Sequence, residues 1–287
     1  MRDMILVTGA TGTIGSELLR QLAARGEKAR ALTRDPTRAR VPSGVEVVRG
    51  DYHEPASVEA AMSGVSALFA VGVLGPGDAD ADAALVAAAR AAGVRRVVKL
   101  SAIGTGDPAL GAVGKWHLGG EQAIKTSELE WTVLRPSSFA SNTLSWAEAI
   151  HSGNPVPNMT GAGTQGVIDP RDVSEVAAEA LLAPGHTGRT YTLTGPELLT
   201  TSDQATTLSE VLGRPVATVD VPPDALREQF IEAGMSETYA EGVLAGTAYV
   251  RRGGNAVLTE DLRQVLGREP RTYAQWARDH KEAFARD

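Results

Sequence analysis

Three glycines spaced as G-x-x-G-x-x-G follow directly after the apolar residues 4–7. Gly9 would allow a sharp turn, Gly12 would let a pyrophosphate approach the backbone, and Gly15 would let a helix pack closely on a strand. The start of that helix would offer N–H groups and a positive dipole end to phosphate oxygens. An ordinary strand–helix turn is the alternative, but the position between strand and helix favours a dinucleotide site. Its predicted contacts are Gly9, Thr11, Gly12, Thr13, Ile14 and Gly15.

A second pattern concerns the phosphate that distinguishes NADP from NAD. The strand predicted over residues 28–33 ends without an acid and is followed by Arg34, with Arg38 close behind. An acidic residue here would bind the ribose hydroxyls of NAD, whereas an arginine suits the 2′-phosphate of NADP. Asp35 disagrees with this interpretation, and a solvated basic loop is the alternative. We predict NADPH as the cofactor, with Arg34 on its 2′-phosphate.

The next two predicted strands also end in candidate cofactor contacts. Asp51 and Tyr52 follow the strand at 45–48, and Asp51 could accept from the adenine amino group or cap the next helix. The apolar strand at 67–72 ends in a glycine-rich exit, residues 72–77, which would pass the cofactor. The contacts predicted at these strand ends are Asp51, Tyr52, Ala70, Val71 and Gly72.

Candidate proton donors lie near the end of a fifth strand, residues 94–100, and in the helix after it. Ser101 ends the strand, where ligands of open parallel sheets bind, so the nicotinamide is expected near it. In the helix, His117 could be a general acid with a pKa near working pH, or a surface or cofactor-packing histidine. Glu121 would share its helix face. Lys115 could contact the nicotinamide ribose or be a plain surface lysine. The predicted catalytic residues are His117, Lys115 and Ser101.

Composition narrows the classes of protein. The chain has 287 residues, a net charge of -7 and no basic block, which argues against a nucleic-acid-binding surface. It has no cysteine, which excludes disulfides, thiol nucleophiles and thiolate metal sites, and its histidines lack metal-ligand spacing. No signal segment and no apolar run of the ~20 residues needed for a membrane span is found. We expect a cytoplasmic protein with a small-molecule substrate and no metal; a homodimer is compatible with the sequence.

Apolar segments and turn residues alternate regularly over the first half of the chain. This alternation predicts right-handed crossovers and a parallel sheet, a Rossmann-type doubly wound α/β fold. The expected strands are residues 4–7, 28–33, 45–48, 67–72, 94–100 and 130–134, and the expected helices are residues 13–25, 55–62, 79–92 and 114–127.

From residue 140 the alternation loosens, and a smaller, mainly helical C-terminal lobe is expected. Residues 153–166 contain two prolines and four glycines and are predicted to form a long loop, a binding flap. We expect an NAD(P)-binding domain at 1–150 and a substrate lobe at 151–287, with the substrate between them. Strands near 166–168 and 190–193 would interleave the two. A helix is expected to start within residues 168–173, and further elements are expected at residues 202–212, 216–221, 224–233, 236–250, 259–266 and 271–284.

Taken together, the motifs resemble the NmrA-like group of atypical short-chain dehydrogenases over almost the whole chain. The resemblance is carried by the glycine motif, Thr33-Arg34, Leu100-Ser101-Ala102, residues 131–139 and Thr194-Gly195-Pro196. It implies an NADP site made by residues 9–15, Arg34, the strand exit at 70–72 and the 136–142 loop. The residues that it adds to the cofactor site are Pro136, Ser137, Ser138 and Phe139.

One departure from the better-known short-chain dehydrogenases bears on the chemistry. Those enzymes use a Tyr-x-x-x-Lys pair to protonate a carbonyl, and no tyrosine of this chain has a lysine four residues later. Hydride addition to a quinone gives a resonance-stabilised phenolate that needs little acid catalysis. The sequence therefore predicts an NADPH-dependent reductase of quinone-like or conjugated carbonyl substrates. A redox sensor that binds NADP without turnover, and a ketoreductase or epimerase that uses His117, are the alternatives.

Overall fold

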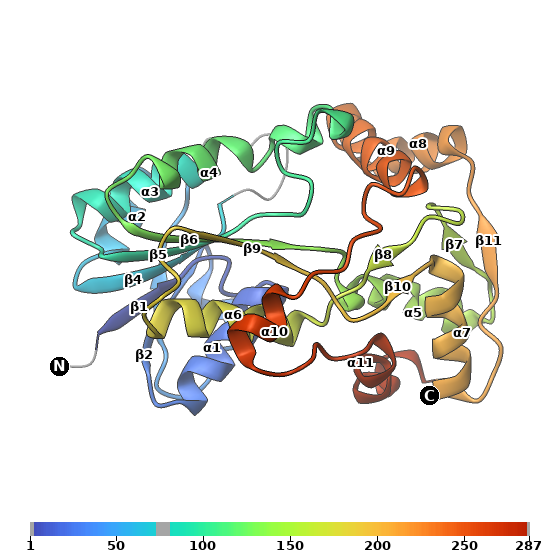
Figure 1. Cartoon of the computed structure of the whole chain (residues 1–287), viewed down its shortest axis with the longest axis horizontal. Coiled ribbons are helices and arrows are strands. Elements are labelled where there is room, and N and C mark those ends of the chain that lie inside the picture. The colour runs from blue at the N-terminus through green and yellow to red at the C-terminus, as the bar shows by residue number, and fades with distance from the viewer. Residues whose placement is uncertain (1–2, 73–80, 286–287) are drawn as a thin grey trace.

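The computed structural model describes residues 3–72 and 81–285. Its centre is a seven-stranded sheet in the order β3-β2-β1-β4-β5-β6-β9, in which all neighbouring strands are parallel (Figure 1). The order reverses between β1 and β4, and ligands of open α/β sheets bind at the carboxyl ends of strands beside such a reversal. The predicted Rossmann-type fold is confirmed. The strands are β1 (Met4–Val7), β2 (Lys28–Thr33), β3 (Glu46–Arg49), β4 (Val65–Ala70), β5 (Arg96–Leu100), β6 (Glu130–Pro136) and β9 (Arg189–Leu193).

Helices cover both faces of the sheet, and successive side chains along each strand point to opposite faces. Ile5 and Val7 belong to the hydrophobic core under α1, α6 and α10, whereas Leu6 belongs to the core under α2, α3 and α4. The helices of the first face are α1 (Thr13–Ala24), α6 (Pro170–Leu182) and α10 (Asp261–Leu266), and those of the second are α2 (Pro55–Ala61), α3 (Ala81–Ala91) and α4 (Leu118–Lys125).

The C-terminal half adds a third core beside one end of the sheet (Figure 1). Trp276 and Tyr273 stack in it with ring centroids 5.7 Å apart. The domain boundary at residue 150 stays a prediction, and α6, β9 and α10 return to the sheet. The remaining elements are α5 (Ala147–Ser152), β7 (Val156–Asn158), β8 (Gln165–Gly166), β10 (Leu198–Leu199), α7 (Thr201–Leu212), β11 (Thr218–Asp220), α8 (Pro223–Glu232), α9 (Glu237–Arg251) and α11 (Tyr273–Asp279).

Three predicted elements differ from the structure by more than two residues at an end. The segment 153–166 is not one long loop, because β7 pairs with β11 and β8 pairs with β10. The last predicted helix, 271–284, ends at Asp279 and is followed by a 3-10 turn. The helix predicted from residue 114 begins at Leu118, after a 3-10 turn. Here the carbonyl of Gly114 accepts from the Gly106 N–H at 2.8 Å, which ties this turn to the preceding loop.

No helix within residues 3–72 and 81–285 is long and apolar enough to cross a membrane. The predicted glycine-rich exit at 72–77 lies, apart from Gly72, outside the described residues.

Candidate active site

The three motif glycines have three different structural roles. Gly9 has a φ of +59°, which favours glycine, so it makes the turn off β1. A Cβ on Gly15 would lie 2.3 Å from the Gly9 carbonyl oxygen, so only glycine lets α1 approach the turn. Gly12 is exposed, and a Cβ there would come no closer than 3.3 Å to the Gly9 oxygen. Only Gly12 therefore faces open space in which a ligand could lie.

The first turn of α1 is built to receive an anion. Gly12 is the N-cap residue, and no side chain caps the helix. The N–H groups of the first turn have no partner within the helix, so they remain available to a phosphate. Thr11 and Thr13 are exposed beside them, whereas Ile14 is buried in the core and could contact a cofactor only through its backbone. These residues fit the pyrophosphate of a dinucleotide.

The ends of β1 and β4 are joined directly beneath this turn. Thr8 Oγ1 accepts from the Val71 N–H at 2.7 Å, and Val71 lies against Gly9. The Tyr52 hydroxyl donates to the Val71 carbonyl, and Ala70 is fully buried. The predicted residues Tyr52, Ala70 and Val71 thus meet at the glycine turn, with the Tyr52 hydroxyl engaged by the backbone.

Arg34 is exposed at the end of β2. Asp35, which disagreed with an NADP site, is engaged locally: its carboxylate accepts from the Thr37 N–H at 3.0 Å and from the Thr37 hydroxyl at 2.6 Å. Asp51 accepts from the His53 N–H at 3.0 Å, and Glu54 rather than Asp51 is the N-cap of α2. Of these three residues, Arg34 alone shows no hydrogen bond or ion pair within the described chain.

A buried ion pair lies beside the end of β4, and the sequence reading missed it. Asp82 in the first turn of α3 and Lys99 on β5 are both fully buried and bonded to each other. Asp82 also accepts from the Gly72 N–H at 2.8 Å, and so fixes a predicted cofactor contact. Burial acts to raise the pKa of Asp82, but His117 and the charge of Lys99 outweigh it and lower the pKa. A lysine inside an apolar strand was the signal, because a buried ammonium needs a partner.

His117 stands immediately before α4 and faces this ion pair. Its Nδ1 lies 3.9 Å from Asp82 Oδ2, too far for a hydrogen bond, and its side chain is 19% exposed. Nδ1 is buried and has no hydrogen-bond partner among the residues that the structure describes. The ring therefore stands between the buried Asp82 carboxylate and the surface.

Glu121 collects four hydrogen bonds one turn further along α4. Its carboxylate is 1% exposed and accepts from Arg135 at 2.7 and 2.8 Å, from Lys125 at 2.8 Å and from the Ser101 hydroxyl at 2.7 Å. Burial would raise the pKa of Glu121, but these bonds lower it to about 2. Glu121 is thus ionised at neutral pH, and the Ser101 hydroxyl donates its hydrogen bond to the Glu121 carboxylate. Ser101 can accept a hydrogen bond from a ligand but is not free to donate one.

Tyr249 on α9 is a second hydroxyl near the same edge that sequence reasoning missed. A Cβ on Gly104, in the loop after β5, would lie 3.6 Å from its oxygen. The hydroxyl donates to Asp107 at 2.9 Å. Burial and this hydrogen bond raise the pKa of Tyr249, so it is a weaker acid than free tyrosine.

The loop after β6 uses most of its side chains in the fold. Ser137 is 5% exposed and donates to Asn255 at 3.1 Å, and Phe139 packs against the core under α1 and α6. Pro136 is buried, and Ser138 is half-buried with its hydroxyl near Asn142. The Ser137 side chain is therefore engaged within the fold, whereas the Phe139 side chain is only partly buried, and both cofactor contacts stay predictions.

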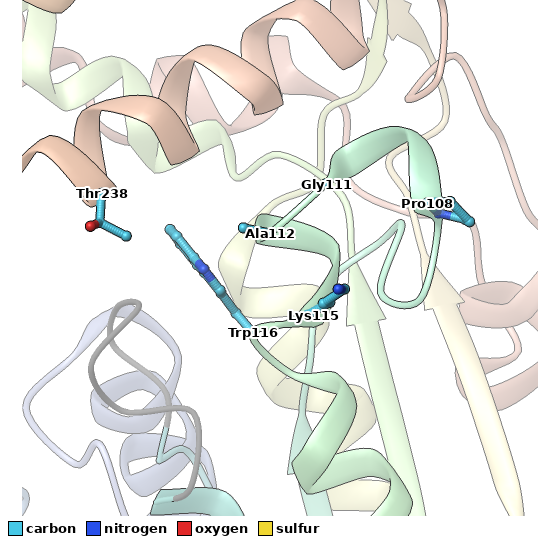
Figure 2. A pocket seen from close by; sticks show the side chains of 6 residues that line it. All are labelled: Pro108, Gly111, Ala112, Lys115, Trp116 and Thr238. Carbon is cyan, nitrogen blue, oxygen red and sulfur yellow. The ribbon is translucent and has the colours of Figure 1, made fainter.

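Lys115 is not part of this buried network. It lies exposed on the 3-10 turn before α4 and lines a pocket of about 570 Å³ (Figure 2). The other lining residues are Pro108, Gly111, Ala112, Trp116 and Thr238.

Comparison with known proteins agrees with this geometry. Residues 9–184 match the family model described as NAD(P)H-binding, and the chain belongs to this family. The resemblance to the NmrA-like group that the motifs indicated is confirmed. The solved structure of an NmrA mutant shares the fold, with a TM-score of 0.76 at 18% identity.

Two relatives match along nearly their whole length. The (4-alkanoyl-5-oxo-2,5-dihydrofuran-3-yl)methyl phosphate reductase of Streptomyces griseus is 41% identical over 98% of this chain and 99% of its own. The NAD(P)H azoreductase of Xenophilus azovorans is 35% identical over the same shares of the two chains. The structure of Citrobacter sp. triphenylmethane reductase complexed with NADP(H) superposes with a TM-score of 0.82 at 26% identity, covering 96% of this chain and 99% of that one.

Proposed function

We propose that this protein is an NADPH-dependent reductase that transfers hydride to a quinone-like or conjugated carbonyl substrate. The three relatives named above are reductases of a dihydrofuranone, of azo compounds and of triphenylmethane dyes. These acceptors share a conjugated system that can spread the electron pair delivered with the hydride. Bound NADPH would supply that hydride.

One observation carries the proposal: two hydroxyls near the carboxyl edge of β5 already donate their hydrogen bonds to carboxylates of the protein. Ser101 donates to Glu121, and Tyr249 donates to Asp107. Protonation of a simple alkoxide requires a positioned acid, whereas a phenolate, or an enolate whose charge is shared by two carbonyl groups, is stable enough to leave protonation to solvent. The edge therefore suits conjugated acceptors, and His117 is the histidine that stands beside it.

The preference for NADPH rests on the end of β2. Arg34 is exposed and unpaired within the described residues, whereas the carboxylate of Asp35 is occupied by Thr37. A 2′-phosphate would find a guanidinium there, and ribose hydroxyls would find no free carboxylate. We further propose that the enzyme acts in the cytoplasm on a small molecule, as a homodimer.

The test is oxidation of NADPH and NADH, followed by absorbance, with quinones, azo and triphenylmethane dyes, conjugated lactones and saturated ketones. We expect turnover of conjugated acceptors, faster with NADPH than with NADH. Tight NADPH binding without turnover of any acceptor would instead support the redox sensor. Saturated ketones reduced as fast as quinones would support the ketoreductase.

A further inference from the structure

The pocket beside Lys115 is lined by the flat indole of Trp116 and by the unpaired ammonium of Lys115. The indole of Trp116 extends from the turn before α4 toward Thr238 at the start of α9, and Lys115 leaves the same turn (Figure 2). A Cβ on Gly242 of α9 would lie 2.8 Å from the Trp116 ring. The backbone of α9 therefore holds the indole in place as a fixed wall.

The ammonium of Lys115 has no hydrogen bond or ion pair within residues 3–72 and 81–285, and none of the six lining residues is acidic. Among the acids of the neighbouring elements, Asp107 accepts from Tyr249 and Glu237 pairs with Arg227. Glu241 on α9 is exposed and has no partner among the described residues. The chain as a whole has a net charge of -7, so an unpaired cation in a pocket is a local exception. It attracts a bound anion and repels a second cation.

The pocket is linked to the candidate active site through neighbouring residues of the chain. Lys115 and Trp116 directly precede His117, which faces Asp82, and Glu121 one turn later holds Ser101. A substrate lying along the edge of β5 would extend past the start of α4 into this pocket. Its volume of about 570 Å³ lies within the range of pockets that hold small organic ligands.

We propose that this pocket selects planar conjugated acceptors that carry an acidic group, a carboxylate, sulfonate or phosphate, with Lys115 binding the acid and Trp116 the flat part. The proposal deepens the proposed reductase function and rests on it. Lys115 is then a residue of substrate specificity rather than a contact of the nicotinamide ribose.

The test compares 1,4-naphthoquinone with its 2-sulfonate, using the ratio of their kcat/KM values with NADPH. Comparing this ratio between variants cancels the different reactivity of the two quinones. Lys115→Met should lower the sulfonate-to-neutral ratio about tenfold or more, the usual worth of a hydrogen bond to a charged group. Lys115→Arg should largely restore the ratio. Lys28→Met, which removes an exposed lysine at the opposite end of the strands, should leave it at the wild-type value.

The dependence of this ratio on ionic strength separates charge attraction by Lys115 from a purely structural role of Lys115. Raising ionic strength from about 20 mM to about 500 mM should lower the ratio of the wild type and leave that of Lys115→Met unchanged. Equal ratios in wild type and Lys115→Met would overturn the proposal.

Failure of the reductase function would look different, namely NADPH binding without oxidation by either quinone. In that case, quenching of tryptophan fluorescence by the naphthoquinone sulfonate decides the question. Weaker binding to Lys115→Met than to wild type supports the anionic subsite, and equal binding contradicts it.

Discussion

The glycine turn leaves its polar groups open, whereas the cluster around Glu121, at the same edge of the sheet, pairs nearly every polar group that it contains. The first turn of α1 has no side-chain cap, and Gly12 is exposed. Glu121 is buried and accepts from Arg135, Lys125 and Ser101. Backbone N–H groups without a partner can bind an anion. A buried carboxylate whose oxygens all accept hydrogen bonds makes the surrounding structure rigid. The glycine turn is thus suited to cofactor binding, and the cluster around Glu121 is suited to keeping the edge of the sheet rigid.

The most drastic way to test the open turn is Gly12→Val. A side chain there would occupy the space of the pyrophosphate, and its Cβ would lie 3.3 Å from the Gly9 carbonyl oxygen, which would have to shift slightly. We expect NADPH binding to be abolished in fluorescence titrations of the folded variant. Gly246→Val places the same side chain where no atom lies within 4 Å and serves as the control. Undiminished NADPH affinity in a folded Gly12→Val protein would remove this turn from the cofactor site.

The next largest effect concerns proton transfer. If His117 donates a proton to ketones, His117→Ala should lower their turnover by ~10²–10⁴-fold, the usual range for a general acid. Quinone reduction should fall much less, because its product anion needs little protonation. His151→Ala, an exposed histidine on α5, is the control. Wild-type rates of His117→Ala with both substrate types would exclude His117 from the mechanism.

The saturated cluster predicts a pH-dependent stability. The pKa of Glu121 is lowered from 4.5 to about 2, so its contribution is complete above pH 4.5 and is lost as the pH falls toward about 2. This difference corresponds to about 3 kcal/mol. In urea unfolding, the stability gap between wild type and Glu121→Gln should therefore narrow as the pH falls from 5 toward 2.

Glu59→Gln removes an exposed carboxylate on α2 and provides the matched control for this titration. A gap between wild type and Glu121→Gln that stays constant over this range would contradict the pairing of Glu121.

The smallest effect concerns the cofactor phosphate. Arg34→Ala should cost ~1.5–3 kcal/mol of NADPH affinity, the usual worth of a hydrogen bond to a charged group, and should barely change NADH affinity. Titration of both cofactors measures the difference. Equal losses would show that Arg34 acts structurally, and a wild-type preference for NADH would contradict the NADPH assignment itself.

The same contrast explains what the sequence could predict. The glycine turn and the strands around it depend on residues close together in the chain, so their spacing was sufficient. The buried pair of Asp82 and Lys99, and the bond from Ser101 to Glu121, join side chains 17 and 20 residues apart on different elements. Spacing alone does not place such partners together, although the lysine inside an apolar strand could have indicated that Lys99 needs a buried acidic partner.

Long-range contacts also account for the errors in the element boundaries. The start of α4 was predicted too early because the Gly106–Gly114 hydrogen bond, which ties the turn to a loop, has no signature in the local pattern. The segment 153–166 looked like a free loop because its strand partners, β10 and β11, lie far along the chain.

The central claim is that this edge reduces acceptors whose hydride adducts are already stable anions. The most direct measurement is kcat/KM with NADPH for quinones, conjugated lactones and ketones, graded by the pKa of the reduced product. We predict that kcat/KM rises steeply as that pKa falls, and that His117→Ala loses activity mainly with the most basic products. Rates that are independent of product pKa would show efficient proton donation at this edge and would contradict the account.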